Sequence, residues 1–157
     1  MPVKVSGCGS LVKLDFTGGG TFTTIALVDS ITYWNRSKSI NDTPTLDCGE
    51  DNAEIGNVEQ STLTFALYRD HQDADHEAIL TNFDESISDN SKKDIACQIY
   101  VPDYSNDGGT TSNNVTYEAD CQIASIEPED VTPDGYWKET VTLLRKGAIT
   151  KTVTATI

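Results

Sequence analysis

Apolar and polar residues alternate along several short stretches of this chain, most clearly in residues 58–69. There Leu63, Phe65 and Leu67 fall on one side of an extended backbone, and smaller residues between them fall on the other. A period of two is typical of a β-strand with one buried face. Similar alternation, or enrichment in β-branched and aromatic residues, predicts further strands at residues 11–16, 22–27, 29–35, 92–102, 115–124, 136–145 and 149–157.

One segment follows a helical period instead. Residues 73–86 begin with acids and place Ile79 and Phe83 at helical spacing. Asp73 or Asp75 can cap such a helix, and acidic side chains in the first turn suit the helix dipole. The segment therefore predicts a single α-helix.

Two connections between strands are unusual. Gly18–Gly20 join the first two strands, and glycine adopts the positive φ angles of tight turns, so they predict a hairpin. Residues 36–57 are polar and almost without periodicity, which predicts a long structureless connection, and loops of that length are usually functional or disordered. The elements together predict one mainly β domain over residues 1–157: an antiparallel β-sandwich or small barrel with one helix outside and a long inter-strand loop.

The charge narrows the classes of partner. The chain has 25 Asp and Glu against 11 Lys and Arg, a formal net charge of −14 over 157 residues. Arg69 is the single Lys or Arg between residues 41 and 91. Such a surface repels phosphate and anionic headgroups, which argues against a protein that grips nucleic acid or a membrane. Residues 1–16 lack the long apolar segment of a secretory signal.

The residue types that carry chemistry form no convincing active site. His71 and His76 lack the i, i+4 spacing of helical zinc sites, so the acids around them predict a polar helix entry rather than a metal cluster. No serine lies in a nucleophile-elbow pattern, and no Lys-Ser/Thr pair follows the glycines. We therefore expect no catalytic residue, no metal site and no cofactor.

The four cysteines follow neither a zinc spacing nor a C-x-x-C motif. They are Cys8, Cys48, Cys97 and Cys121, and the last two alternate with apolar residues. This favours small buried residues on strand faces. A disulfide between Cys97 and Cys121 is the alternative if their strands pair, although no export signal supports it.

The order of the segments is also informative. "GSLVKLDFTGGGTFTTIALVDSITYWN" is followed by the polar loop, by "GNVEQSTLTFALYRD" and by the helical "HEAILTNF", and then by "IACQIYVPD", "VTYEADCQIASI" and "YWKETVTLLRKG". This order resembles the major tail tube proteins of long-tailed bacteriophages and gene transfer agents, over nearly the whole chain. The four cysteines and the turn-rich residues 104–114 depart from the family pattern.

The resemblance implies a structural virion protein that contacts copies of itself. Its subunits would form hexameric rings that are assembled in the host cytoplasm and stacked into the tube of a virion tail. The lumen would carry the tape measure protein and later double-stranded DNA, which passes without specific binding. Tail terminator and tail tip proteins would be further partners, and no membrane is involved. An acidic lumen suits this role, because a basic one would hold each passing phosphate.

The same resemblance, combined with strand alternation, gives two sets of candidate residues. The lumen-facing candidates are Thr62, Thr64, Glu118, Asp120 and Gln122. The long loop is implied to reach the adjacent ring, so the ring-stacking candidates are Trp34, Arg36, Asp42, Asp47, Glu50 and Asp51. A solvated outer face is the alternative for the first set, and a place in the core is the alternative for Trp34.

Two other classes of function stay open. One is a monomeric β-sandwich binding module, a carbohydrate- or calcium-dependent adhesin, whose aromatic platform would come from Tyr100, Tyr104, Tyr117 and Trp137. The other is a different virion component, such as a tail terminator. An enzyme is the weakest choice, because no nucleophile, metal site or cofactor loop is evident.

Overall fold

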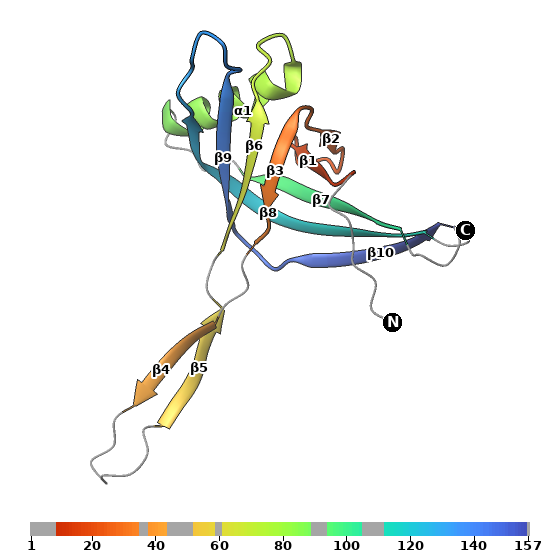
Figure 1. Ribbon diagram of the computed structural model, residues 1–157. Helices are drawn as coiled ribbons and strands as arrows, with labels where there is room; N and C mark the ends of the chain where they lie inside the picture. The colour runs from red at the N-terminus through yellow and green to blue at the C-terminus, as the bar shows by residue number, and fades with distance from the viewer. Residues whose placement is uncertain are drawn as a thin grey trace.

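The computed structural model describes residues 9–34, 38–43, 52–58, 61–88, 94–104 and 112–156 (Figure 1). This part of the chain is mainly β with one α-helix, as predicted. The strands are β1 (Leu11–Asp15), β2 (Thr23–Thr24), β3 (Val28–Thr32), β4 (Lys38–Thr43), β5 (Asn52–Val58), β6 (Thr62–Tyr68), β7 (Ile95–Tyr104), β8 (Ser112–Pro128), β9 (Lys138–Arg145) and β10 (Thr150–Thr156), and the helix is α1 (Ala74–Ser88).

One antiparallel sheet of eight strands forms the body. Its order is β2-β1-β7-β8-β9-β6-β3, and β10 pairs with β8 beside this path. β8 carries two partners along one edge: β10 pairs with Ser112–Glu118 and β9 with Cys121–Pro128. β7 lies along the other edge. β8 therefore continues from the body into a projecting arm that it shares with β7 and β10 (Figure 1).

The sheet curls until its two end strands come close together. β2 ends at Thr24 and β3 begins at Val28, although these strands are the opposite edges of the sheet. A fully extended chain between those residues spans at most about 14 Å. Seven flat strands would hold their edges about 28 Å apart. The short link, in which Leu27 has a φ of 59°, therefore requires the barrel-like curl.

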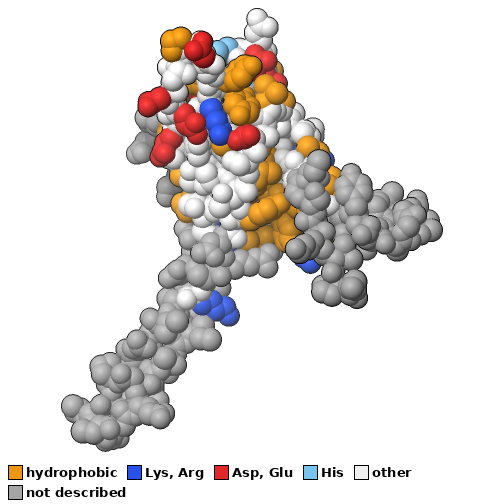
Figure 2. Space-filling model, in the orientation of Figure 1, with side chains coloured by type: hydrophobic (Ala, Val, Ile, Leu, Met, Phe, Trp, Pro, Cys, Tyr) orange, Lys and Arg blue, Asp and Glu red, His pale blue; other side chains and the backbone are white. Residues whose placement is uncertain are grey.

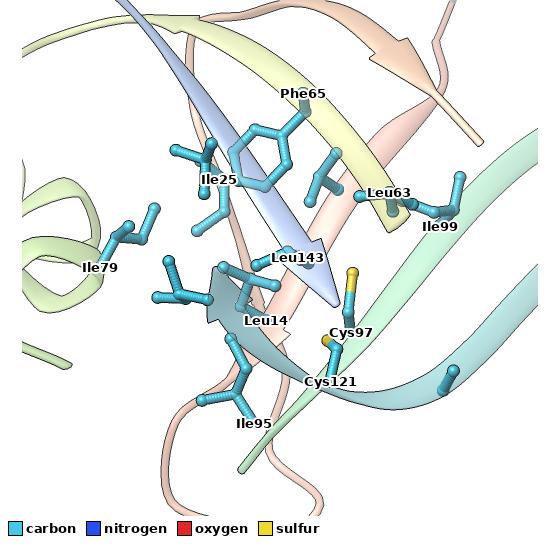
Figure 3. Packing of buried hydrophobic residues seen from close by; sticks show 14 of the residues in the cluster. Leu14, Ile25, Leu63, Phe65, Ile79, Ile95, Cys97, Ile99, Cys121 and Leu143 are labelled. Carbon is cyan, nitrogen blue, oxygen red and sulfur yellow. The ribbon is translucent and has the colours of Figure 1, made fainter. Parts of the chain in front are cut away.

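The apolar faces of the strands meet inside this curl (Figure 3). Phe65 from β6, Leu143 from β9 and Leu14 from β1 are completely enclosed. Each side chain of this size stabilises the fold by about 1.5–3 kcal/mol when it leaves water. The core cluster consists of Val12, Leu14, Ile25, Trp34, Leu63, Phe65, Leu67, Ile79, Ile95, Cys97, Ile99, Ala119, Cys121, Ile123, Val141 and Leu143.

Cys97 and Cys121 belong to this core, as predicted, and both are free thiols. Cys97 lies opposite Ala119 in the β7–β8 ladder, so the two thiols are diagonal neighbours on the buried face (Figure 3). Hydrogen bonding to Cys121 and burial raise the pKa of Cys97 well above its ordinary value. The protonated thiol packs as a small apolar side chain. Cys8 and Cys48 lie outside the described residues.

α1 begins where the sequence places its cap. The carboxylate of Asp73 accepts hydrogen bonds from the N–H groups of Asp75 and His76, at 2.9 and 3.2 Å. Ile79 is buried in the core, and Phe83 packs against it. The helical period of the sequence therefore corresponds to the face that covers the sheet. Among the described residues, no helix is both long enough and apolar enough to cross a membrane.

The glycine-rich hairpin is confirmed, and it contains a set of hydrogen bonds that the sequence pattern did not predict. Gly18 and Gly20 have φ angles of 72° and 83°, which L side chains rarely adopt. The carboxylate of Asp15 accepts hydrogen bonds from the N–H groups of Thr17, Gly18 and Gly20, at 2.9, 3.1 and 2.8 Å. The bond from Thr17 contributes most to a lowered pKa of Asp15. An ionised carboxylate therefore organises the turn.

Residues 36–57 contain regular structure, which corrects the expectation of a structureless connection. β4 and β5 form a separate antiparallel ribbon in which Asn41 lies opposite Glu54 and Thr43 lies opposite Asn52. Figure 1 shows the ribbon projecting from the end of the body where β3 ends and β6 begins. A ribbon that stands apart from the main sheet needs no apolar face, so no hydrophobic alternation marks it in the sequence.

Candidate interaction surfaces

The five predicted lumen residues share one face of the sheet, which points away from the core. Thr62, Leu144 and Gln122 form one row across β6, β9 and β8, and the next residue on each strand is buried. Each of the other candidates is two or four residues from Thr62 or Gln122 on the same strand, so its side chain points to the same side. This outer face contains Thr62, Thr64, Glu118, Asp120 and Gln122. That the face lines a lumen stays a prediction.

Hydroxyl, amide and carboxylate groups lie together on the described part of this outer face. Gln98 donates a hydrogen bond to Glu118 at 2.9 Å, and Gln122 donates one to Asp94 at 2.6 Å. Lys13 lies opposite Gln98 in the β1–β7 ladder, and Lys138 and Lys146 alternate with the buried residues of β9, so these lysines share the face with the acids. Sequence reasoning missed Lys13 and Gln98, because their place beside Glu118 depends on the pairing of strands that are far apart in the chain.

β10 has an open edge and is exposed on both faces. It pairs with β8 from Thr150 opposite Glu118 to Thr156 opposite Ser112. No strand in the described part of the chain pairs with its other edge. Its side chains from Thr150 to Val153 are all exposed, and Val153 keeps 56% of its surface in solvent. Unpaired N–H and C=O groups along such an edge form a template for another strand.

A second surface lies at the end of the body where β6 ends and β9 begins. We call Tyr68, His71, Tyr136 and Trp137 the aromatic end cluster. The rings of Tyr68 and Tyr136 meet edge to face at 5.9 Å, and those of His71 and Trp137 do so at 5.5 Å. Tyr136 is 83% exposed and Trp137 is 42% exposed. Figure 2 shows apolar side chains at this end, with acidic and basic ones beside them. Exposed clusters of this composition typically mark protein interfaces.

A buried ionic network holds Trp137 in place. Its indole N–H donates to one carboxylate oxygen of Glu139 at 3.1 Å, and Arg69 donates to the other at 3.2 Å. Arg69 also donates to Glu77 at 2.9 Å. The side chain of Arg69 is 2% exposed, and that of Glu139 is 11% exposed. The network joins the indole of Trp137 to buried charged groups, and sequence reasoning missed it because Arg69 and Glu139 are 70 residues apart.

The two histidines have different surroundings. His76 is fully buried, and its Nδ1 lies 3.1 Å from the backbone N–H donor of Asp70. Because Nδ1 accepts that bond, Nε2 carries the proton and donates to the carbonyl oxygen of Ala26 at 2.9 Å. His76 therefore ties α1 to the link between β2 and β3, while His71 is exposed. Within the described residues, no three His, Cys, Asp or Glu side chains are grouped to hold a metal.

The aromatic residues considered for a sugar platform lie on different surfaces. Tyr117 is on the core side of β8, where its ring meets that of Tyr33 at 6.4 Å. Tyr100 has the opposite parity on β7, and Trp137 is at the far end of the body. The side chain of Tyr104 lies outside the description. The described members of the set therefore do not share one surface.

The structure describes two of the ring-stacking candidates. Trp34 is 7% exposed and belongs to the core cluster, which is the alternative considered for it. Its indole N–H is among the described buried donors that have no hydrogen-bond partner. Asp42 lies on β4 of the ribbon. Outside the described residues are Arg36, Asp47, Glu50 and Asp51, and the stacking role of the whole set stays a prediction.

Solved structures with the same arrangement of elements come from tails and injection machines. One is the tail of a gene transfer agent particle with six-fold symmetry (TM-score 0.60, 20% identity, 94% of this chain and 98% of that chain). Another is the SPP1 tail tube (0.66, 14%, 94% and 78%). A third is a sheath/tube terminator of an extracellular contractile injection system (0.65, 15%, 96% and 98%). The chain has the tail tube fold.

The tail tube fold confirms the likeness that the order of segments indicated. Other structures with this fold come from a baseplate and from a sheath–tube complex. No protein-family model matches the chain, and no curated protein matches its sequence. The tail tube fold is thus recognised here through the arrangement of β1–β10 and α1 rather than through a diagnostic motif.

Proposed function

We propose that this chain is a structural subunit that joins copies of itself into stacked, hexameric rings, forming the tube of a virion tail. The observation that carries the proposal is the open edge of β10, a strand whose described side chains are exposed on both faces. The tail tube fold supports it, and the six-fold symmetric tail of the gene transfer agent supports the ring size.

Ring closure follows from the hydrogen-bonding needs of β10. Its outer N–H and C=O groups are met by water in the monomer, and a neighbouring copy's open strand would meet them instead. The same contact would remove Val153 from solvent. When such pairing is repeated around a closed ring, no strand edge is left over. A closed ring therefore pairs the strand edge that the isolated subunit leaves open.

The outer face of the sheet is the proposed lumen wall. Its described side chains include hydroxyls, amides and the carboxylates of Glu118 and Asp120. With a net charge of −14 per chain, the wall would repel phosphate, so double-stranded DNA would slide without binding. Lys13, Lys138 and Lys146 are cations on this face. Gln98 separates Lys13 from Glu118 along one row. Lys146 lies beside Asp120, whose carbonyl oxygen accepts its backbone N–H at 2.8 Å. Scattered between carboxylates rather than gathered in a stripe, these lysines would hold a polyanion weakly.

The proposed tube determines the other partners. The tape measure protein would occupy the lumen during assembly, before DNA passes through it. Tail terminator and tail tip proteins would close the two ends, and the protein would be found in virion tails after assembly in the host cytoplasm. The role is structural, and it requires no catalytic residue and no cofactor.

Negative-stain microscopy and sedimentation velocity of the purified chain test this proposal, with rings or tubes as the expected result. Two neighbouring substitutions, Thr152→Pro and Val153→Pro, locate the contact, because adjacent N–H groups of a strand point to opposite edges. The proline that removes the outward N–H should keep the wild-type melting temperature and abolish rings. The other should lower the melting temperature by breaking the β8 ladder. Rings formed by both variants, or a wild type that stays monomeric at high concentration, would contradict the proposal.

A tail terminator is the second candidate, because a sheath/tube terminator structure matches over 96% of this chain. Copy number separates the two roles. A tube subunit is present in many copies along the tail, whereas a terminator is confined to one end. Antibody labelling of intact virions, read by microscopy, distinguishes a decorated length from a decorated tip.

A further inference from the structure

We propose that residues 26–32 form a strap that opens locally while the rest of the sheet stays folded, and that its opening uncovers the paired edge of β6. The strap consists of the link at residues 26–27 and of β3, which is an end strand of the sheet. In the closed strap, β3 pairs with β6 from Thr64 to Leu67. The inference concerns the single subunit and does not depend on the proposed tube.

The backbone of the strap is strained at Leu27. Its φ of 59° lies in the left-handed region, and within the described part of the chain no other residue except glycine has a positive φ. A bulky L side chain in this region costs energy that the surrounding structure has to offset. Burial of the side chain does not compensate, because 55% of its surface is exposed to solvent. The strain is therefore released when the strap opens.

Hydrogen bonds from α1 and β6 hold the strained link closed. His76 of α1 donates from Nε2 to the carbonyl oxygen of Ala26 at 2.9 Å, and the N–H of Tyr68 donates to the carbonyl oxygen of Leu27 at 3.0 Å. The His76 ring is fully buried, and its Nδ1 accepts a hydrogen bond from the N–H of Asp70 at 3.1 Å, so both ring nitrogens are used. The helix therefore supplies a contact that opposes the strain.

The rest of the strap packs weakly on the body. Val28 and Ile31 are half-buried against the core, and the other side chains of β3 are exposed. The β3–β6 register shifts between Val28 and Ser30, which interrupts the ladder. The ammonium of Lys138 lies 2.9 Å from the carboxylate of Asp29, but the Asp29 side chain is 39% exposed, so this pair contributes little. Segments with few buried apolar contacts open at a low free energy.

Buried residues fix the chain on both sides of the strap. Ile25 is 3% exposed, and its N–H donates to the carbonyl oxygen of Val12 at 2.9 Å. Figure 3 shows its side chain among the core residues. Trp34, beyond the end of β3, is 7% exposed and belongs to the core cluster. The segment between Ile25 and Trp34 therefore leaves β6 without removing either residue from the core.

Opening of the strap changes what β6 presents to its surroundings. The N–H and C=O groups of β6 that face β3 would lose their partners, while β6 stays in the sheet through its ladder with β9. An unpaired strand edge is a template for an incoming strand. The closed strap therefore keeps this edge of β6 from pairing outside the subunit.

Native-state hydrogen exchange of the full-length chain, at a concentration where sedimentation shows monomer only, tests this inference. The amide of Tyr68 should exchange through local opening, with less protection than the amide of Ile25 or those of the central β7–β8 ladder. Leu27→Asn should slow exchange at Tyr68 about fivefold, because asparagine tolerates a positive φ, and Leu27→Val should accelerate it about fivefold. Val131→Asn, which replaces an exposed apolar residue outside the strap, should change neither rate.

Two variants of His76 test the contact from α1. His76→Leu removes the donor to Ala26 and should leave Tyr68 less protected than His76→Gln, whose amide N–H can still donate. Protection of Tyr68 equal to that of Ile25 in the wild type, or Leu27 variants that shift all amides equally, would overturn the inference. Rings formed by a chain whose strap stays closed overturn this inference alone. A chain whose strap opens but which stays monomeric at high concentration overturns the proposed tube alone.

Discussion

Replacing Arg69 by methionine tests the buried network most directly. The guanidinium is enclosed, and it joins Glu139 on β9 to Glu77 on α1. Methionine fills similar space without charge, so Glu139 would keep only the indole N–H of Trp137 as a partner. The structure therefore predicts an uncompensated carboxylate in a site that is 11% exposed.

The magnitude follows from the burial of each partner. Removing one member of a buried ion pair destabilises a protein by about 3–5 kcal/mol. The contact with Glu77 adds little, because that carboxylate is 46% exposed and such pairs contribute about 0–1 kcal/mol. For a domain of this size the loss lowers the melting temperature by about 6–20 °C. The double variant Arg69→Met/Glu139→Met should recover most of it, because no charge stays buried.

Urea denaturation followed by circular dichroism gives the free energies, at a concentration where sedimentation shows monomer only. Lys146→Met is the matched control: it removes an exposed cation and should change the free energy of unfolding by less than about 0.5 kcal/mol. A loss below about 1 kcal/mol for Arg69→Met would refute the reasoning. A double variant no more stable than the single one would do the same.

Three further predictions concern the turn, the core and the thiols. Because the pKa of Asp15 is lowered in the fold, its contribution is present above about pH 4 and is lost as the pH falls through the folded value. The melting temperature should thus fall less between pH 5 and pH 2 for Asp15→Asn than for the wild type. An equal fall in the two proteins would contradict this. Leu143→Ala should lower the free energy of unfolding in urea by about 2–5 kcal/mol, whereas Thr142→Ala on the outer face should change it little. Cys97 should resist thiol reagents at pH 8 until the protein unfolds, as peptide mass mapping can show, and rapid labelling of the native protein would be inconsistent with its burial and raised pKa.

Features that depend on neighbouring residues were predictable from the sequence. The strands with one apolar face were found, because alternation records which side packs on the core. The cap at Asp73 and the positive φ angles of the glycine turn were predicted for the same reason: each is a local rule of backbone geometry. The common outer face of Thr62 and Glu118 also follows from parity along each strand.

Features that depend on pairing between distant segments were not predictable. The β4–β5 ribbon has no apolar face, so nothing periodic marks it. Arg69 and Glu139 meet only after β6 and β9 pair, and Lys13 reaches the same row as Glu118 only through β7. The aromatic end cluster was missed for a related reason. Trp137 was expected in a platform with Tyr100, Tyr104 and Tyr117, whereas its ring lies against His71, which reaches it only after β6 and β9 pair.

The length of β8 has a mechanical consequence. Because the same strand is central both in the body and in the arm, a load applied to the arm would run along the strand axis into the middle of the sheet. The backbone hydrogen bonds from β8 to β7 and β9 would then be loaded in shear at the same time, rather than broken one after another. A wall built from such subunits would deform elastically and keep its inner diameter, because many hydrogen bonds share the load and none has to break first.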